Sequence, residues 1–76
     1  MKLALARGLR ARRERRRMTQ SELATLIESS QSRVAKMEAG DRSVSLDLLV
    51  RSLLAMGTTK REIARIIAAP KGSRAA

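Results

Sequence analysis

The sequence predicts an all-α fold, a compact domain of five helices, and three observations predict it. Apolar residues recur at helical spacing along the 76 residues. Ser or Thr stands before the later predicted helices, where a side-chain oxygen can cap the first turn. Gly40, Gly57 and Pro70 follow three of these helices and are suited to ending them. We therefore expect one domain over residues 1–70 and a flexible tail over residues 71–76.

A first helix is expected from Lys2 to about Arg16. Leu5 and Leu9 lie four residues apart and share its inner face, while arginines cover the rest of its surface. Six of the eight residues from Arg10 to Arg17 are arginine. Side chains that point in so many directions around one helix cannot all reach a single phosphate track. Several of them are therefore expected simply to face solvent.

Two short helices are expected next, separated by a turn. In the capping box formed by Thr19 and Glu22, the Thr19 hydroxyl accepts from the Glu22 amide and the Glu22 carboxylate accepts from the Thr19 amide. A second helix therefore starts at Gln20. The serine pair 29–30 interrupts it, because serine favours caps and turns, and a third helix runs from Gln31 to Ala39.

The fourth and fifth predicted helices carry the most apolar sequence. The fourth begins after Ser45 and closes at Gly57; its apolar residues are Leu46, Leu49, Val50, Leu53, Leu54 and Met56. Thr59 and Glu62 form a second capping box that starts the fifth helix.

The segment from Thr19 to Gly40 has the spacing of a helix-turn-helix motif, formed by helices two and three. A capped helix is followed by a break of about three residues and a short helix with a polar outer face. The apolar residues that pack the two helices across each other are Leu23, Ala24, Ile27, Val34 and Met37. Ala24 must be small for the helices to approach closely. The second helix then projects its amino end outward.

Charge and composition favour duplex DNA as the partner. Seventeen Lys and Arg against seven Asp and Glu give a net charge of +10, which favours a polyanion. The chain has no Phe, Tyr or Trp, the rings on which single strands usually stack, so double-stranded DNA is expected. It has no Cys and no His, so we expect no disulfide, no metal and no cofactor. A water-excluding catalytic site is not expected from so few residues, which argues against an enzyme.

The apolar run Leu3–Ala6 near the start resembles part of an export signal. Its four residues are fewer than the roughly seven that such a signal needs, and no stretch approaches the roughly eighteen of a membrane span. We therefore expect no membrane association and a cytoplasmic, nucleoid-associated protein.

Three short motifs follow one another in a recognisable order and spacing. They are Thr19-Gln20-x-Glu22-Leu23-Ala24, Ser30-Gln31-Ser32-x-Val34 and Met37-Glu38-x-Gly40. Leu9, Arg10 and Arg13 upstream, and Ser45–Gly57 downstream, extend the pattern. It resembles the XRE-type helix-turn-helix family, the class of the phage repressors and Cro. The resemblance implies a sequence-specific DNA-binding domain whose recognition helix is 31–39.

The resemblance also implies which residues contact DNA. Gln31, Ser32 and Lys36 would face the major groove, where Gln suits adenine and Lys suits guanine. Arg33 beside them would suit either guanine or a phosphate. Gln20 would meet a phosphate and brace Gln31.

Two further arginines complete the expected DNA contacts, Arg13 in the first helix and Arg42 in the loop after the third. The resemblance further implies that Arg13 forms a structural ion pair with Glu38.

This sequence departs from the family pattern at Arg17 and Glu28, where family members commonly carry glycine. A non-glycine residue in the left-handed region costs roughly 1 kcal/mol. Glu28 also adds a negative charge near the expected DNA surface.

A homodimer is expected, because a domain below about 80 residues gains little stability from its own core. Ile63, Ile66 and Ile67 follow a core that the fourth helix is expected to close, so they are the expected dimerisation residues together with Leu53. A two-fold dimer would place its recognition helices about 34 Å apart, on an operator with inverted symmetry.

The function that these observations favour is a transcriptional regulator, an autorepressor of its own operon. Two alternatives stay open. One is an antitoxin or adaptor that mainly binds a toxin or other protein through the fifth helix and residues 71–76. The other is a nucleoid protein that binds DNA by charge alone, with equal affinity for unrelated sequences.

Overall fold

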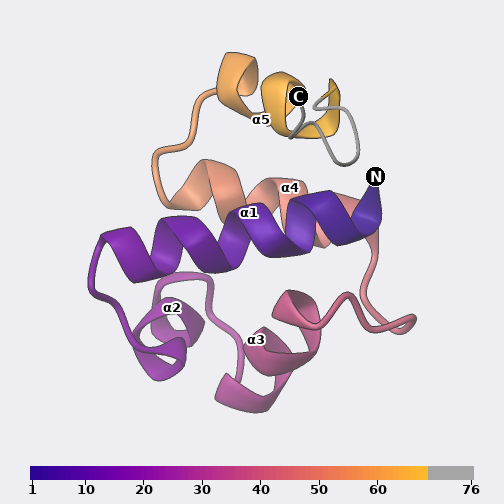
Figure 1. Cartoon of the computed structure of the whole chain (residues 1–76). Helices are drawn as coiled ribbons and strands as arrows, with labels where there is room; N and C mark the ends of the chain where they lie inside the picture. Colours follow the sequence, from indigo (N-terminus) through magenta and orange to yellow (C-terminus); the bar gives the residue numbers. More distant parts are fainter. Residues whose placement is uncertain (69–76) are drawn as a thin grey trace.

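The computed structural model describes residues 1–68, which form five helices (Figure 1). Their bounds are α1, Lys2–Arg15; α2, Gln20–Leu26; α3, Gln31–Glu38; α4, Leu46–Ala55; and α5, Lys60–Ala68. The all-α fold and the helix-turn-helix formed by α2 and α3 are confirmed. The first and third helices each end one residue earlier than expected. The expected stop at Pro70 and the tail 71–76 lie outside the described residues.

Helix α1 is the central element of the fold. Figure 1 shows α2 and α3 on one side of α1 and α5 on the other, with α4 packed along α1. Helix α1 contacts α3, α4 and α5, and α2 and α3 contact each other extensively. The helix-turn-helix is therefore held from behind by α1, and its outer side is left open.

The core is entirely aliphatic, as a chain without aromatic residues requires. Its buried members come from all five helices and from the loop before α4: Leu5, Leu9, Leu23, Ala24, Val34, Met37, Val44, Leu49, Leu53, Met56 and Ile63. Ile27 packs against this cluster while staying partly exposed. The residues expected to pack the two motif helices across each other are therefore all in the core or against it.

Four side-chain caps fix where the later helices begin. The hydroxyls of Thr19, Ser30, Ser45 and Thr59 each accept from a backbone amide three residues ahead, at 3.0–3.1 Å. The amides of Thr19 and Thr59 in turn donate to the carboxylates of Glu22 and Glu62, so both expected capping boxes are present. Each cap satisfies amides that the first turn of a helix leaves without partners.

The turns also have the expected backbone geometry. Gly40 and Gly57 have φ of 69° and 85° after α3 and α4, in the region that favours glycine. Arg17 and Glu28 both have φ of 56°. The two residues that replace the glycines of the family pattern therefore do lie in the left-handed region, and each carries the strain that a Cβ atom creates there.

Helix α5 belongs to the core of the single chain, which corrects the expectation that α4 closes the core. Ile63 is only 6% exposed, and Leu53 of α4 is fully buried. Ile66 lies so close to α1 that a Cβ at Gly8 would come within 2.9 Å of its Cδ1 atom. An ion pair from Arg12 Nη2 to Glu62 Oε2, 2.5 Å long, joins the same two helices. Of the expected dimerisation residues, Ile67 is the most exposed, at 38%.

Within residues 1–68, no helix combines the length and the apolar character needed to cross a membrane.

Candidate nucleic-acid interface

A chain of side-chain hydrogen bonds connects the start of α2 with the start of α3. Gln31 Nε2 donates to Gln20 Oε1 at 2.8 Å, and Gln20 Nε2 donates to Glu38 Oε1 at 3.2 Å. Glu38 accepts from Arg13 of α1 at both oxygens. The contact expected between Gln20 and Gln31 is confirmed. This series of hydrogen bonds orients the side-chain amide of Gln31, which lies exposed at the first position of α3.

The ion pair expected between Arg13 and Glu38 is also confirmed. Arg13 Nε and Nη2 donate to the two Glu38 oxygens at 2.6 and 3.1 Å, and Arg13 Nη1 donates to the Met18 carbonyl at 2.7 Å. The two side chains are only 12% and 5% exposed. The hydrogen bonds to Glu38 raise the pKa of Arg13 above its ordinary value.

These contacts give Arg13 a structural role, which favours that role over the expected contact with DNA. All three nitrogens of its guanidinium group already donate to groups of the same chain. Breaking them to reach a phosphate would leave Glu38 buried without its partner, which is costly. Within the structure, Arg13 is connected to the outer face of α3 through Glu38 and Gln20.

The outer face of α3 is polar and free of packing contacts. Val34 and Met37 are fully buried, whereas the expected contact residues of this helix, Gln31, Ser32, Arg33 and Lys36, are exposed. Serine at 30 starts the helix by capping the Arg33 amide. Helix α3 is thus anchored by one face and presents the other to solvent, as the sequence predicts.

The loop between α3 and α4 adds residues that the sequence analysis did not single out. Asp41 Oδ1 accepts from the Ser43 amide at 2.8 Å and from the Ser43 hydroxyl at 2.7 Å. These two bonds lower the pKa of Asp41, with a smaller contribution from the charges of Lys36 and Lys2. The two bonds bridge the loop from Asp41 to Ser43, and Arg42 lies exposed between these residues.

A shallow groove of about 270 Å³ runs between this loop and α3. Its lining residues are Ser30, Ser32, Arg33, Lys36, Ser43 and Val44. Three of the predicted contact residues on α3, Ser32, Arg33 and Lys36, therefore share one concave surface with Ser43. The sequence signal that could have indicated this turn is an Asp followed two residues later by a Ser, because an Asp side chain often accepts from the residue two positions ahead.

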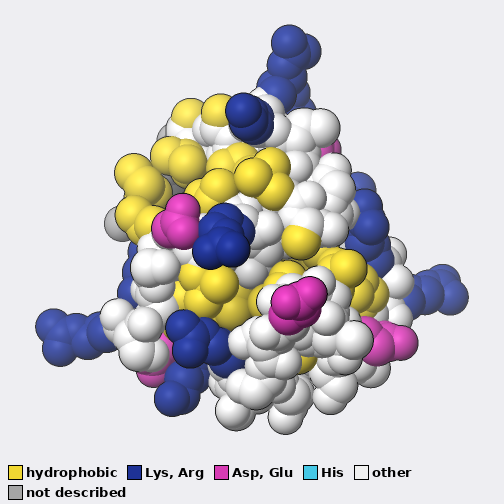
Figure 2. Space-filling model, turned by 180° about the vertical axis from the view of Figure 1, so that it is seen from behind, with side chains coloured by type: hydrophobic (Ala, Val, Ile, Leu, Met, Phe, Trp, Pro, Cys, Tyr) yellow, Lys and Arg dark blue, Asp and Glu magenta, His cyan; other side chains and the backbone are white. Residues whose placement is uncertain are grey.

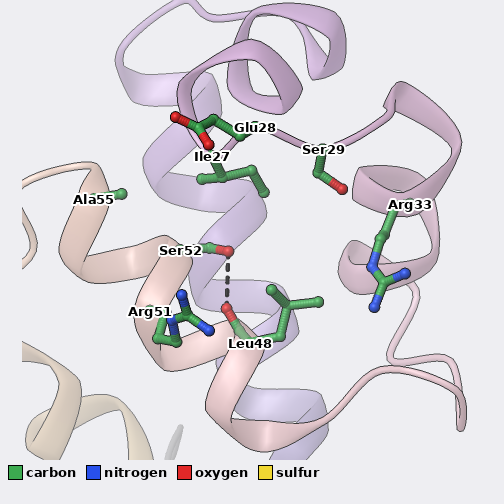
Figure 3. Close-up of a pocket in the computed structure, with 8 residues that line it drawn as sticks. All are labelled: Ile27, Glu28, Ser29, Arg33, Leu48, Arg51, Ser52 and Ala55. Atoms are coloured by element: carbon green, nitrogen blue, oxygen red, sulfur yellow. Dashed lines mark hydrogen bonds between the residues drawn. The ribbon is translucent and has the colours of Figure 1, made fainter.

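A second, larger groove of about 510 Å³ lies between the α2–α3 turn, α3 and α4. Figure 3 shows Arg33 of α3 and Arg51 of α4 on opposite sides of it, with Glu28 and Ile27 at its upper rim. The Ser52 hydroxyl, which faces the groove, already donates to the Leu48 carbonyl at 2.8 Å (Figure 3). The groove adds positive charge beside α3.

Comparison with known proteins gave one match. A family model described as helix-turn-helix matches residues 9–63, from the inner face of α1 to the buried isoleucine of α5. No curated protein and no solved structure matches this chain.

Proposed function

Because this chain belongs to the XRE-type helix-turn-helix family of DNA-binding regulators, we propose that it is a sequence-specific autorepressor that binds an inverted-repeat operator as a homodimer. Helix α3 enters the major groove, and its exposed side chains read the bases. Regulation through a toxin or other protein partner is the alternative, and it predicts that operator binding is secondary.

The hydrogen bonding of Gln31 carries the proposal. A glutamine amide has two N–H donors and one carbonyl acceptor. One N–H of Gln31 is used by Gln20, which leaves one N–H and the carbonyl oxygen. These two groups complement the N7 acceptor and the N6 donor that adenine shows in the major groove. Gln31 is thus held in the orientation for one bidentate adenine contact.

The proposed contacts of the other polar residues follow from the same hydrogen bonds and from their positions on α3. Gln20 accepts from Gln31 and donates one N–H to Glu38, so its second N–H is left for a backbone phosphate. Lys36 lies farther along the exposed face of α3 and suits a guanine. Arg33 borders both grooves, and we assign it to a phosphate beside the groove.

The surface that best suits a second copy of this chain is a stripe along α4. Leu46 and Leu54 are 40% and 41% exposed, and Val50 between them is partly exposed. Asp47 and Arg51 lie beside them, with Arg51 Nη1 and Asp47 Oδ2 3.8 Å apart. Figure 2 shows that hydrophobic side chains gather on the face turned away in Figure 1, next to an acidic and a basic side chain.

Two properties make this stripe suitable for a two-fold dimer. Two chains of charge +10 repel each other, so their contact must avoid the arginine-rich surfaces, and the stripe carries one acid and one base. A two-fold interface must also be self-complementary, and it can place Arg51 of one copy against Asp47 of the other. Ile67 of α5 is a further exposed apolar side chain that a second copy could cover.

A band-shift titration at about 150 mM salt tests the proposal, with DNA from upstream of the protein's own gene and a scrambled duplex of equal length. We expect the upstream DNA to bind at least about 1,000-fold more tightly, the lower end for sequence-specific proteins. Equal affinity for the two duplexes contradicts the proposal and favours binding by charge alone.

A further inference from the structure

Arg17, in the turn between α1 and α2, occupies a backbone position that glycine would occupy without strain. Its φ is 56°, and it reverses the chain after α1. The Arg17 amide donates to the Glu14 carbonyl and the Met18 amide donates to the Arg13 carbonyl, both at 3.0 Å. These bonds use only the backbone, so they do not require an arginine. Strained backbone positions of this kind are concentrated at functional sites, so an arginine at this one is a reason to look for a use of its side chain.

The Arg17 side chain has no such use inside the chain. Arg10, Arg12 and Arg13 of α1 each form an ion pair with a carboxylate. Arg16 folds toward Gly57, with Nη2 about 3.0 Å from where a Cβ of that glycine would lie. Arg17 is exposed, and no carboxylate among residues 1–68 forms an ion pair with it. Its charge is therefore available to a partner.

The position of the turn indicates which partner. Arg17 precedes Gln20 by three residues, and Gln20 contacts Gln31 at the exposed start of α3. Figure 1 shows that α5 lies on the opposite side of α1 from α2 and α3. The exposed basic residues of α5, Lys60, Arg61 and Arg65, are therefore on that side as well. A duplex seated on α3 is thus flanked by the α1–α2 turn and is remote from α5.

We propose that Arg17 is a phosphate-binding residue that grips the DNA backbone beside the base-contacting helix, and that this contact is why the chain keeps an arginine at a strained position. The inference rests on the proposed DNA-binding function and adds a residue to it. A phosphate contact positions the protein without reading sequence. Its loss therefore weakens binding to every duplex by the same factor.

The expected sizes follow from counterion release. One phosphate contact contributes about 0.9 to the steepness with which log affinity falls against log salt. Between 1 M and 150 mM salt this slope corresponds to about fivefold in affinity, which is the loss expected at 150 mM when the contact is removed. Replacing Arg17 by Gly also relieves the left-handed strain, which should raise Tm by about 4 °C in a domain of this size. The same substitution thus raises stability while it lowers affinity.

Four full-length variants separate strain from charge: Arg17→Gly, Arg17→Lys, Glu28→Gly and Arg65→Ala. Glu28→Gly relieves the same strain at the other left-handed residue that is not glycine, and it removes an acidic rather than a basic side chain, so it should not weaken DNA binding. Arg65→Ala removes an exposed basic residue from α5. Arg65 forms no ion pair within residues 1–68. Arg17→Lys keeps both the charge and the strain. Each variant is titrated with upstream and scrambled duplexes at several salt concentrations, and its Tm is measured.

We expect both glycine variants to melt at higher temperature and only Arg17→Gly to lose about fivefold affinity, equally for both duplexes, with a shallower salt slope. Arg17→Lys should bind nearly as well as the wild type. The inference is overturned if Arg17→Gly keeps the affinity and salt slope of Arg65→Ala while the wild type binds DNA. A wild-type protein that binds neither duplex overturns the proposed function itself.

Discussion

Glu38, the last residue of α3, is hydrogen-bonded through both carboxylate oxygens to Arg13 of α1, and one of these oxygens also accepts from Gln20. One buried carboxylate therefore ties the recognition helix to the helix behind it and to the residue that orients Gln31. Glu38 therefore links the stability of the domain to the proposed reading of bases by Gln31.

Replacing Glu38 by Gln should lower the free energy of unfolding by about 3 kcal/mol, because it leaves the Arg13 charge buried without its partner. It should also loosen Gln20 and Gln31 and reduce operator preference. Urea unfolding and band shift measure the two effects. Glu14→Gln is the control, because Glu14 is exposed and its loss should change stability by no more than about 1 kcal/mol. Equal losses in the two variants would contradict the role given to Glu38.

The Glu62 carboxylate gives the fold a defined acid sensitivity. The hydrogen bond from the Thr59 amide, followed by that from Arg12, lowers the pKa of Glu62 to about 2 from an ordinary 4.5. The folded form thus holds this proton more weakly than the unfolded form does. The stability that Glu62 contributes is complete above pH 4.5 and is lost as the pH falls through about 2.

Unfolding by urea at a series of pH values tests whether the stability that Glu62 contributes is lost as the pH falls. The Glu62→Gln variant should be less stable than the wild type at pH 6, and the gap between the two should close between pH 4.5 and 2. A gap that stays constant over this range would show that Glu62 does not titrate as its contacts indicate.

Two threonines provide a matched test of hydroxyl hydrogen bonding. Thr58 Oγ1 is buried without a hydrogen-bond partner among residues 1–68, whereas Thr19 Oγ1 caps α2. Thr58→Val should raise stability by about 1 kcal/mol, because valine fills the same volume without a buried hydroxyl. Thr19→Val should lower it by about 1 kcal/mol through loss of the cap. Thermal melts of both variants decide the matter, and destabilisation by Thr58→Val would be the contrary result.

The isoleucines of α5 should separate folding from self-association. Ile63→Ala should cost about 3 kcal/mol, because the side chain is buried against α1 and α4. Ile67→Ser should leave stability of the monomer nearly unchanged and weaken the proposed dimer. Sedimentation velocity and urea unfolding are measured on both. A folded, fully dimeric Ile67→Ser protein would remove α5 from the interface.

The features that the sequence predicted are those that a few neighbouring residues determine. The caps at Thr19 and Thr59 and the left-handed Gly40 depend on local backbone geometry, so their helix bounds are accurate to about one residue. The pair between Arg13 and Glu38 was predicted from a family resemblance, since 25 residues of sequence separate its members. The resemblance did not reveal that this pair occupies every nitrogen of Arg13.

The features that the sequence did not predict depend on packing between distant segments. Ile66 against Gly8 and Arg12 with Glu62 bring α5 onto α1, and nothing in the periodicity of α5 distinguishes a core helix from a dimerisation helix. The same is true of the groove that Ser43 shares with Arg33 and Lys36. Which faces of α4 and α5 stay exposed becomes clear only when the five helices are assembled.

The central claim is that exposed side chains of α3 read the operator, and the double variant Gln31→Ala, Lys36→Ala tests it most directly. Its affinity is measured for upstream and scrambled duplexes, beside Lys60→Ala on α5 as a control for lost charge. The account predicts nearly equal affinity for the two duplexes, with helicity and oligomeric state unchanged. Undiminished preference for the upstream duplex in a folded double variant would contradict it.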